Sequence, residues 1–277
     1  MATATLCQWH SSSSSSSLCH ISSSSSSSSL CHISSSSSSS SFCGRVACRA
    51  HQPQAVHLSV STSSPDKTIF QIENSGVIAC LRANSAEVAY EAANAAIAGG
   101  ISVLEIVMST PGVFEVIKQL VKEHPIMALG VGTILRIEDA KAAVNAGAKF
   151  LMSPAIVKDV MYYIQSGEVL YIPGTMTPTE ILSAYDAGAK IVKIYPVSAL
   201  GGSQYISALK KPFPKLSMVA SQGINLESIE EYISRGASAV VLSDAIFDKE
   251  AIAQRNYEKI QKLAHSAALL GNKAVNR

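Results

Sequence analysis

From about residue 66 onward the sequence predicts a small (β/α)8 barrel, a ring of eight parallel strands surrounded by helices. Short apolar segments typical of buried parallel strands alternate with amphipathic helical segments eight times within roughly 200 residues. The helical segments repeatedly end in Ala-Gly-Ala or Ala-Gly-Gly, which is typical of a tight return from a helix to the next strand. A doubly wound open sheet is the second candidate, but no Gly-x-Gly-x-x-Gly motif follows the first strand.

The expected elements follow one another along the chain. Strands are expected at Val77–Leu81, Ser102–Met108, Met127–Val131, Phe150–Met152, Val169–Ile172, Ile191–Tyr195, Ser217–Ala220 and Ala239–Leu242. Helices are expected at Ala86–Ala98, after Pro111, at Ile137–Ala146, Val157–Gln165, from Thr177 to Gly188, at Gln204–Leu209, Leu226–Ser234 and, as one long closing helix, Lys249–Leu270. Pro111 suits a first helical turn, and Thr177-Pro-Thr-Glu180 has the pattern of a capping box.

Residues 1–65 are expected to form a disordered segment that precedes the barrel domain at 66–277. They are rich in serine and contain no Asp or Glu. Serine tracts bury too little apolar surface to offset the entropy lost on ordering. A Ser-rich, acid-poor segment with late arginines, here Arg45 and Arg49, is typical of an organelle transit peptide, and the run from Arg45 to Ala50 resembles a stromal processing site. We therefore expect import into the chloroplast stroma; a tail without a targeting role is the alternative.

Composition and cysteine usage argue against several classes of protein. The 277 residues are 47% hydrophobic and 15% charged, with a net charge of +2, which gives no sign of a nucleic-acid partner. No segment has the roughly 18 uninterrupted apolar residues that a membrane span needs. Cys80 is the one cysteine of the barrel region, which fits a reducing compartment. The pairs Cys19-His20 and Cys31-His32 lie in serine tracts, so we expect no metal site there.

Lys193 is the first candidate for catalysis. In a barrel of this kind the active site lies at the carboxyl ends of the strands. Lys193 lies in the apolar strand Ile191-Val-Lys-Ile-Tyr195, and an inward lysine needs a reason because lysine is rarely buried. Burial lowers the pKa of a lysine, and an amine brought to about 7–8 can attack a carbonyl. The alternative is that Lys193 faces outward, as Lys190, three residues away, is expected to do.

Glu105 is the second candidate, because it places a carboxylate in the apolar strand Leu104-Glu-Ile-Val-Met108. Beside a buried lysine it would act as a counter-ion or as a proton-transfer group. An unpaired buried carboxylate is costly. Glu105 and Lys193 are therefore expected to work together.

Two further polar residues lie at expected strand ends. Arg82 ends the first strand and is suited to hold a substrate carboxylate by two parallel hydrogen bonds; the alternative is an arginine that only solvates the barrel rim. Thr133 follows Gly130-Val-Gly132, where glycines let the backbone approach a ligand closely. Thr133 also suits the N-cap of the next helix, and both roles can coexist.

Six segments in one order along the chain point to a known family. They are Leu81-Arg-Ala-Asn-Ser85, Leu104-Glu-Ile, Gly130-Val-Gly-Thr133, Ser153-Pro154, Ile172-Pro-Gly-Thr-Met-Thr-Pro178 and Val192-Lys-Ile-Tyr-Pro196. With these segments, residues from about Val77 to Ala264 resemble the KHG/KDPG aldolase family, small Schiff-base barrels that split 2-oxo acids to pyruvate. Together with the N-terminal segment, the resemblance is to a plant plastid-type member.

The resemblance implies Lys193 as the Schiff-base lysine and Glu105 as the acid/base, acting through a water. It implies that the substrate is a 4-hydroxy-2-oxo acid, that the chain forms a homotrimer, and that no metal or organic cofactor takes part. The remaining site residues it implies are Arg82 and Thr133 at the substrate's carboxylate end and Pro154 and Tyr195 as walls of the pocket.

The positions that bind phosphate in some members depart from the family's pattern. Those members cradle the phosphate of 2-dehydro-3-deoxy-6-phosphogluconate with backbone amides of a Thr-Gly-Gly turn and a Gly-Ser pair. The corresponding positions here are Ser221, Gln222, Gly223, Ser243 and Asp244. Asp244 would bring a negative charge toward a phosphate dianion, and Ser109 replaces an arginine that some members carry. The expected substrate is therefore of the 2-dehydro-3-deoxy-6-phosphogluconate or the 4-hydroxy-2-oxoglutarate type, and these departures weigh against the phosphorylated acid.

Two other functions remain as alternatives to the aldolase. A phosphosugar epimerase on a similar small barrel would need an acid/base pair across the pocket and would have no use for Lys193. A decayed barrel kept as a binding or assembly module fits Asp244, but it does not explain why Lys193 and Glu105 are both present. The two charged residues favour the aldolase.

Overall fold

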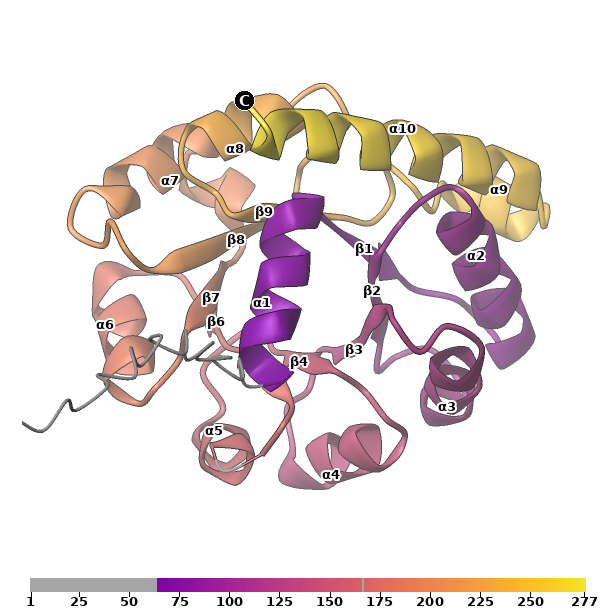
Figure 1. Ribbon diagram of the computed structural model, residues 1–277, viewed down its shortest axis with the longest axis horizontal. Helices are drawn as coiled ribbons and strands as arrows, with labels where there is room; N and C mark the ends of the chain where they lie inside the picture. Colours follow the sequence, from indigo (N-terminus) through magenta and orange to yellow (C-terminus); the bar gives the residue numbers. More distant parts are fainter. Residues whose placement is uncertain (1–63, 166) are drawn as a thin grey trace, which may run out of the picture. The chain divides into compact units, whose positions relative to one another are not determined.

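The computed structural model describes residues 64–165 and 167–277, which form a (β/α)8 barrel (Figure 1). Its strands are β1 (Val77–Leu81), β2 (Val103–Val107), β3 (Ala128–Gly132), β4 (Phe150–Met152), β5 (Leu170–Ile172), β6 (Gly174–Thr175), β7 (Ile191–Ile194), β8 (Ser217–Ser221) and β9 (Ala239–Leu242). Its helices are α1 (Ser64–Ser75), α2 (Ala86–Ala98), α3 (Val113–Glu123), α4 (Ile137–Asn145), α5 (Lys158–Ile164), α6 (Pro178–Asp186), η1 (Val197–Leu200), α7 (Ser203–Lys210), α8 (Ile229–Ser234), α9 (Lys249–Ala253) and α10 (Tyr257–Val275).

The predicted barrel is confirmed and the open sheet is wrong. Each predicted strand is present, with ends that differ by at most one residue. α6 begins with the predicted capping box, in which Thr177 and Glu180 exchange side-chain to backbone hydrogen bonds. Among the described residues no helix is both long and apolar enough to cross a membrane. The predictions of disorder, of a transit peptide and against a metal site at the Cys-His pairs lie outside the described residues.

The ring closes through one strand that is interrupted at Pro173. All strand pairs are parallel, in the order β5-β4-β3-β2-β1-β9-β8-β7-β6, and β5 and β6 are the two parts of the interrupted strand. Proline has no N–H to donate. The carbonyl of Pro173 still accepts the backbone N–H of Lys193 at 2.9 Å, so β7 pairs with this strand where β4 no longer does.

Alternate residues of each strand fill the inside of the ring, as in other barrels. The inner cluster contains Ile78, Val103, Val107, Phe150 and Ile191, all buried. The other residues of the strands pack against the surrounding helices in a second, larger cluster. Any charged residue that shares the inward positions is therefore enclosed by apolar side chains.

Helix α1, which the sequence did not predict, closes the end of the barrel where the strands begin (Figure 1). Ile72 is fully buried in the inner cluster, and Ile69 packs against that cluster. Polar contacts fix the helix to residues at the starts of three strands: Gln71 to the carbonyl of Ile126, Asp66 to Lys190, and Glu73 to Ser217. Only two apolar side chains turn inward, too few to produce a recognisable helical period.

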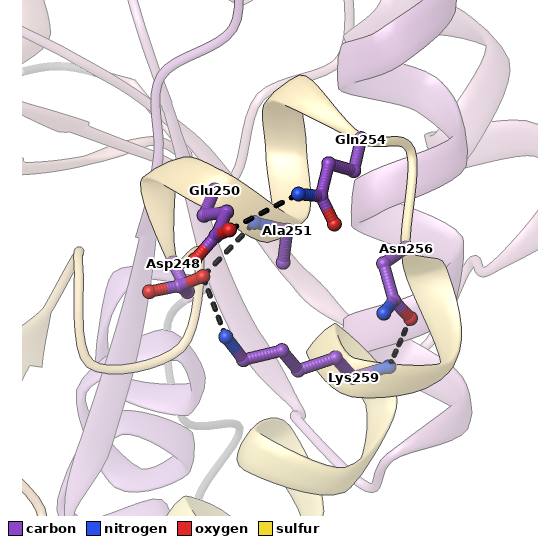
Figure 2. A network of polar contacts seen from close by, with 6 residues as sticks. All are labelled: Asp248, Glu250, Ala251, Gln254, Asn256 and Lys259. Atoms are coloured by element: carbon purple, nitrogen blue, oxygen red, sulfur yellow. Dashed lines mark hydrogen bonds and ion pairs between the residues drawn. The ribbon is translucent and has the colours of Figure 1, made fainter.

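The predicted closing helix Lys249–Leu270 is wrong in one respect, because it is two helices. α9 ends at Ala253 and α10 begins at Tyr257, with Arg255 between them at a positive φ of 53°. Figure 2 shows why the chain restarts here: Asp248 caps α9 through the N–H of Ala251, and Asn256 caps α10 through the N–H of Lys259. The Lys259 side chain returns to Asp248 at 2.8 Å and ties the two helices together.

Candidate active site

Lys193 and Glu105 both point into the barrel. Lys193 lies on β7 and is 7% exposed, while Glu105 lies on β2 and is 1% exposed. Both occupy the positions that alternate with outward residues such as Val192 and Leu104, which pack against the helices. The alternative of an outward Lys193 is wrong. Lys190 is the outward lysine, exposed and paired with Asp66 at the other end of the strand.

The Glu105 carboxylate occupies space that Gly132 leaves free. A Cβ at Gly132 would lie 1.4 Å from Oε1 of Glu105, far closer than any real contact. The Gly130-Val-Gly132 segment was expected to let the backbone approach a ligand. Gly132 instead makes room for the carboxylate, while a Cβ at Gly130 would lie 2.5 Å from the ring of Phe150. Glycine is therefore required at position 132 for Glu105 to lie where it does.

Cys80 is a site residue that the sequence reasoning missed. It lies on β1, 3% exposed, directly opposite Glu105 in the strand register. Burial raises the pKa of the Cys80 thiol, and the nearby Glu105 carboxylate raises it further, whereas Arg82 and Lys193 lower it. The thiol is therefore protonated at neutral pH. Because Ile78 faces inward, strand alternation could have identified Cys80 as inward too. It could not have shown that Cys80 lies beside Glu105, which depends on the strand register.

A cavity of about 360 Å³ opens at the carboxyl ends of β1, β7, β8 and β9. Its lining includes Cys80, Arg82, Lys193, Tyr195, Ser221, Gln222, Gly223, Ser243 and Asp244. The structure thus brings together most of the predicted site residues, although Glu105, Thr133 and Pro154 are not among those that line the cavity. A larger hollow of about 730 Å³ lies beside α1 at the opposite end and contains none of the candidates.

Arg82 and Tyr195 frame the lysine at the mouth of this cavity. The Lys193 Nζ lies 5.4 Å from the centroid of the Tyr195 ring, within the range of a cation–π interaction. Nη1 of Arg82 donates to Oγ of Ser243 at 3.2 Å and lies 3.8 Å from the sulfur of Cys80. Arg82 therefore links the carboxyl ends of the neighbouring strands β1 and β9 at the edge of the cavity.

Thr133 and Pro154 lie at the ends of β3 and β4, on the other side of the barrel mouth. The predicted N-cap role of Thr133 is wrong, because α4 is preceded by Arg136 and Thr133 has a left-handed backbone with φ 61°. The backbone of Pro154 is fixed by close packing, since a Cβ at Gly174 would lie 2.2 Å from its carbonyl carbon. Oγ of Ser153 donates to the carbonyl of Ile134, which joins the loops that hold the two residues.

The positions that correspond to a phosphate site have an unusual backbone and a local charge. Gln222 and Gly223 have φ values of 89° and 73°, so Gln222 adopts a conformation that glycine favours. The Oε1 of Gln222 accepts a hydrogen bond from the hydroxyl of Ser198. Asp244 is exposed and forms an ion pair with Lys249 at 3.2 Å. The sequence did not predict Ser198 or Lys249 as partners, because each lies in a different element from the residue that it contacts.

These features suit attack by an amine on a carbonyl. A lysine in an apolar barrel faces a cavity large enough for a small 2-oxo acid, and an arginine at its mouth can bind a carboxylate. A carboxylate lies buried on β2 for proton transfer. Within residues 64–165 and 167–277, no cluster of three His, Cys, Asp or Glu side chains is arranged to hold a metal ion.

Comparison with known proteins agrees with this chemistry. The family model described as KDPG and KHG aldolase matches residues 69–263. The 2-dehydro-3-deoxy-phosphogluconate aldolase of Treponema pallidum is 31% identical over 198 residues, which are 71% of this chain and 94% of that enzyme. The KHG/KDPG aldolase of Escherichia coli is 29% identical over 175 residues, 63% of this chain and 82% of that enzyme.

A solved structure extends the agreement to the fold. The KDPG aldolase of Legionella pneumophila, crystallised with pyruvate captured as a covalent carbinolamine intermediate, is 29% identical and superposes with a TM-score of 0.67. The superposition covers 73% of this chain and 97% of that one. With its barrel, its buried lysine and a family match that spans the barrel from Ile69 to Leu263, the chain belongs to the KDPG and KHG aldolase family.

Proposed function

We propose that this aldolase cleaves an unphosphorylated 4-hydroxy-2-oxo acid to pyruvate and an aldehyde, with Lys193 forming the Schiff base and Glu105 transferring the protons. As a member of its family the chain is a carbon–carbon lyase of the Schiff-base class. The observation that carries the residue assignment is the pair of inward charges, 7% and 1% exposed, in a barrel that is otherwise filled with apolar side chains.

The chemistry follows from these two groups. The Lys193 amine adds to the C2 ketone and, with loss of water, forms an iminium that accepts electrons better than a carbonyl does. Glu105 takes the proton of the C4 hydroxyl, the C3–C4 bond breaks, and its electrons form the enamine of pyruvate. Glu105 then returns the proton to C3, and water releases pyruvate. Glu105 does not line the cavity, which supports proton transfer through a bridging water.

The substrate's two ends would meet different groups. Arg82 lies at the mouth beside Ser243 and offers a guanidinium to a carboxylate. Thr133 and Pro154 lie on the opposite side of the barrel mouth. In our proposal Thr133 contacts the carboxylate of the substrate, and Pro154 and Tyr195 form walls of the pocket. Asp244 lies exposed where a phosphate dianion would approach, which supports an acid of the 4-hydroxy-2-oxoglutarate type.

The alternatives explain less of the structure. An epimerase has no use for a lysine buried at the cavity floor, and the family match is to aldolases. A decayed barrel would have no reason to keep glycine at position 132, where a side chain would displace Glu105.

Reduction with borohydride in the presence of pyruvate should attach a pyruvyl group to Lys193. The amine faces the cavity, so its imine with pyruvate forms and is reduced to a stable secondary amine. Mass spectrometry of the digested protein locates the added mass. The matched control is Lys190→Ala, which removes an exposed lysine three residues away and should trap normally. A Lys193→Ala protein that traps as well as the unchanged chain would refute the assignment.

The trapping assay, together with turnover, distinguishes the role of the Lys193 amine from that of the Glu105 carboxylate. Glu105→Gln should still trap pyruvate, because the amide removes no part of the nucleophile. Its turnover should fall roughly 10²–10⁴-fold, the usual contribution of general acid–base catalysis. Turnover close to that of the unchanged chain would leave Glu105 as a counter-ion only.

Asp244→Ser should raise kcat/KM for 2-dehydro-3-deoxy-6-phosphogluconate about fivefold and leave that for 4-hydroxy-2-oxoglutarate unchanged. Removing one negative charge helps a dianion, and unit charges roughly 4 Å apart in water interact by about 1 kcal/mol. Lys249→Gln removes the partner of Asp244 and should act in the opposite direction. Asp186→Ser, at the end of α6, is the neutral control. If the unchanged chain prefers the phosphorylated acid a thousandfold, the proposed substrate class is wrong.

The site of action is a further part of the proposal: we infer that the chain works in the chloroplast stroma. The support is the composition of residues 1–65, which are rich in serine, free of acidic residues and supplied with late arginines. Isolated chloroplasts should import and shorten the full chain, and should not import the chain that lacks residues 1–65. Equal import of both forms would contradict the inference.

We also propose that the chain assembles as a homotrimer. The family resemblance supports this state, and exposed apolar side chains on the neighbouring helices α5 and α6, Tyr162, Leu182 and Tyr185, offer surface for a partner. Light scattering should therefore give a mass of three chains. A mass of one chain at micromolar concentration would contradict it.

A further inference from the structure

The Glu105 carboxylate is buried with part of its hydrogen-bonding capacity unused. Its side chain is 1% exposed, and among the described residues its Oε2 has no hydrogen-bond partner. A buried carboxylate oxygen without a donor is costly, so the groups beside it decide how well the carboxylate is held. Gly132 leaves room for the carboxylate but provides no side chain to hold it.

Cys80 is the residue that the strand register places opposite Glu105 on β1 and whose side chain carries a hydrogen-bond donor. On β3 the inward residues beside Glu105 are Gly130 and Gly132, which have no side chain. On β1 the residue directly opposite is Cys80, whose side chain also faces the barrel interior. Strands in register bring such side chains within contact distance of each other. The thiol of Cys80 is thus the neighbouring-strand group that can donate to the carboxylate.

The surroundings of the thiol favour a donor over a nucleophile. Burial and the negative charge of Glu105 keep the pKa of Cys80 well above its ordinary value, so the sulfur keeps its proton. The charged groups that face this thiol are Glu105 from β2, Arg82 from β1 and Lys193 from β7. Nη1 of Arg82 lies 3.8 Å from the sulfur and uses it as an acceptor, which leaves the S–H to turn toward the carboxylate.

We propose that Cys80 is a positioning residue, whose S–H hydrogen bond holds the Glu105 carboxylate in the orientation from which it transfers protons. The inference rests on the proposed role of Glu105. In the step concerned, the C3–H proton of the pyruvate iminium on Lys193 moves to Glu105. The electrons of the broken C–H bond form the C2=C3 bond of the enamine, and the nitrogen becomes neutral. The thiol keeps its proton throughout, so the step needs no oxidant.

Deuterium exchange at C3 of pyruvate tests this role apart from Schiff-base formation. In D₂O the enzyme exchanges the methyl hydrogens of pyruvate through the enamine, which NMR follows directly, while borohydride trapping reports the Lys193 imine. Cys80→Val removes the donor and keeps an apolar side chain of similar size, and Cys80→Ser keeps a donor. We expect exchange to fall roughly tenfold in Cys80→Val, the effect of one hydrogen bond to a charged group. Trapping should be unchanged, and Cys80→Ser should restore most of the exchange.

Other results would overturn the inference. Exchange at the normal rate in Cys80→Val would show that the thiol holds nothing, and equal losses in Cys80→Val and Cys80→Ser would assign Cys80 to packing. Loss of trapping in a folded Cys80→Val protein would place its role at the lysine instead. If Cys80→Val does not fold, Cys80→Ala takes its place as the variant without a donor.

A separate variant distinguishes this inference from the proposed function. Glu105→Gln should abolish the exchange. If it exchanges at the normal rate, the proton-transfer role of Glu105 is wrong, and the role proposed for Cys80 is wrong with it. If Glu105→Gln is inactive and Cys80→Val is normal, the proposed function stands and only the role of Cys80 is refuted.

Discussion

A carboxylate and an amine buried inside one barrel are the constraint on which the rest of the site depends. Removing an isolated charge from water costs several kcal/mol even after relaxation, so neither Glu105 nor Lys193 would be tolerated in an apolar interior without compensation. The residues around the carboxylate fit it: Gly132 has no side chain that would clash with Glu105, and a protonated Cys80 lies opposite Glu105 on β1. A glycine at position 132 and a thiol at position 80 fill the barrel less well than larger apolar side chains would. A barrel with a purely structural role would not need them.

The two ends of the barrel differ in how they are filled, and the buried charges lie near one of them. At the end where the strands begin, α1 places Ile72 in the inner cluster and polar contacts fasten it to the rim. At the other end the apolar filling stops, and a cavity reaches down to Lys193. Stability is thus concentrated at one end and chemistry at the other, the division typical of this fold.

Sequence periodicity predicted the strands well, because strands buried on both faces appear as short apolar runs between glycine-ended helices. It also located Lys193 and Glu105, since a charge in such a run is conspicuous. It missed α1, because only two apolar side chains of this helix face the barrel. It predicted one helix over Lys249–Leu270, because the break at Arg255 depends on helix caps and does not interrupt the apolar period. Cys80 escaped notice for a different reason: an inward cysteine is unremarkable until the register brings Glu105 beside it.

Charged side chains also shape the mouth of the cavity. Arg82 after β1 and Asp244 after β9 both line it, so a ligand there meets charges of both signs. Lys249 offsets Asp244 only weakly, because the two side chains are 85% and 67% exposed and pairs this solvated contribute little. The turn at Gln222 keeps a glycine-like backbone despite its side chain. The negative charge of Asp244 beside this turn is the feature on which the proposed preference for an unphosphorylated acid rests.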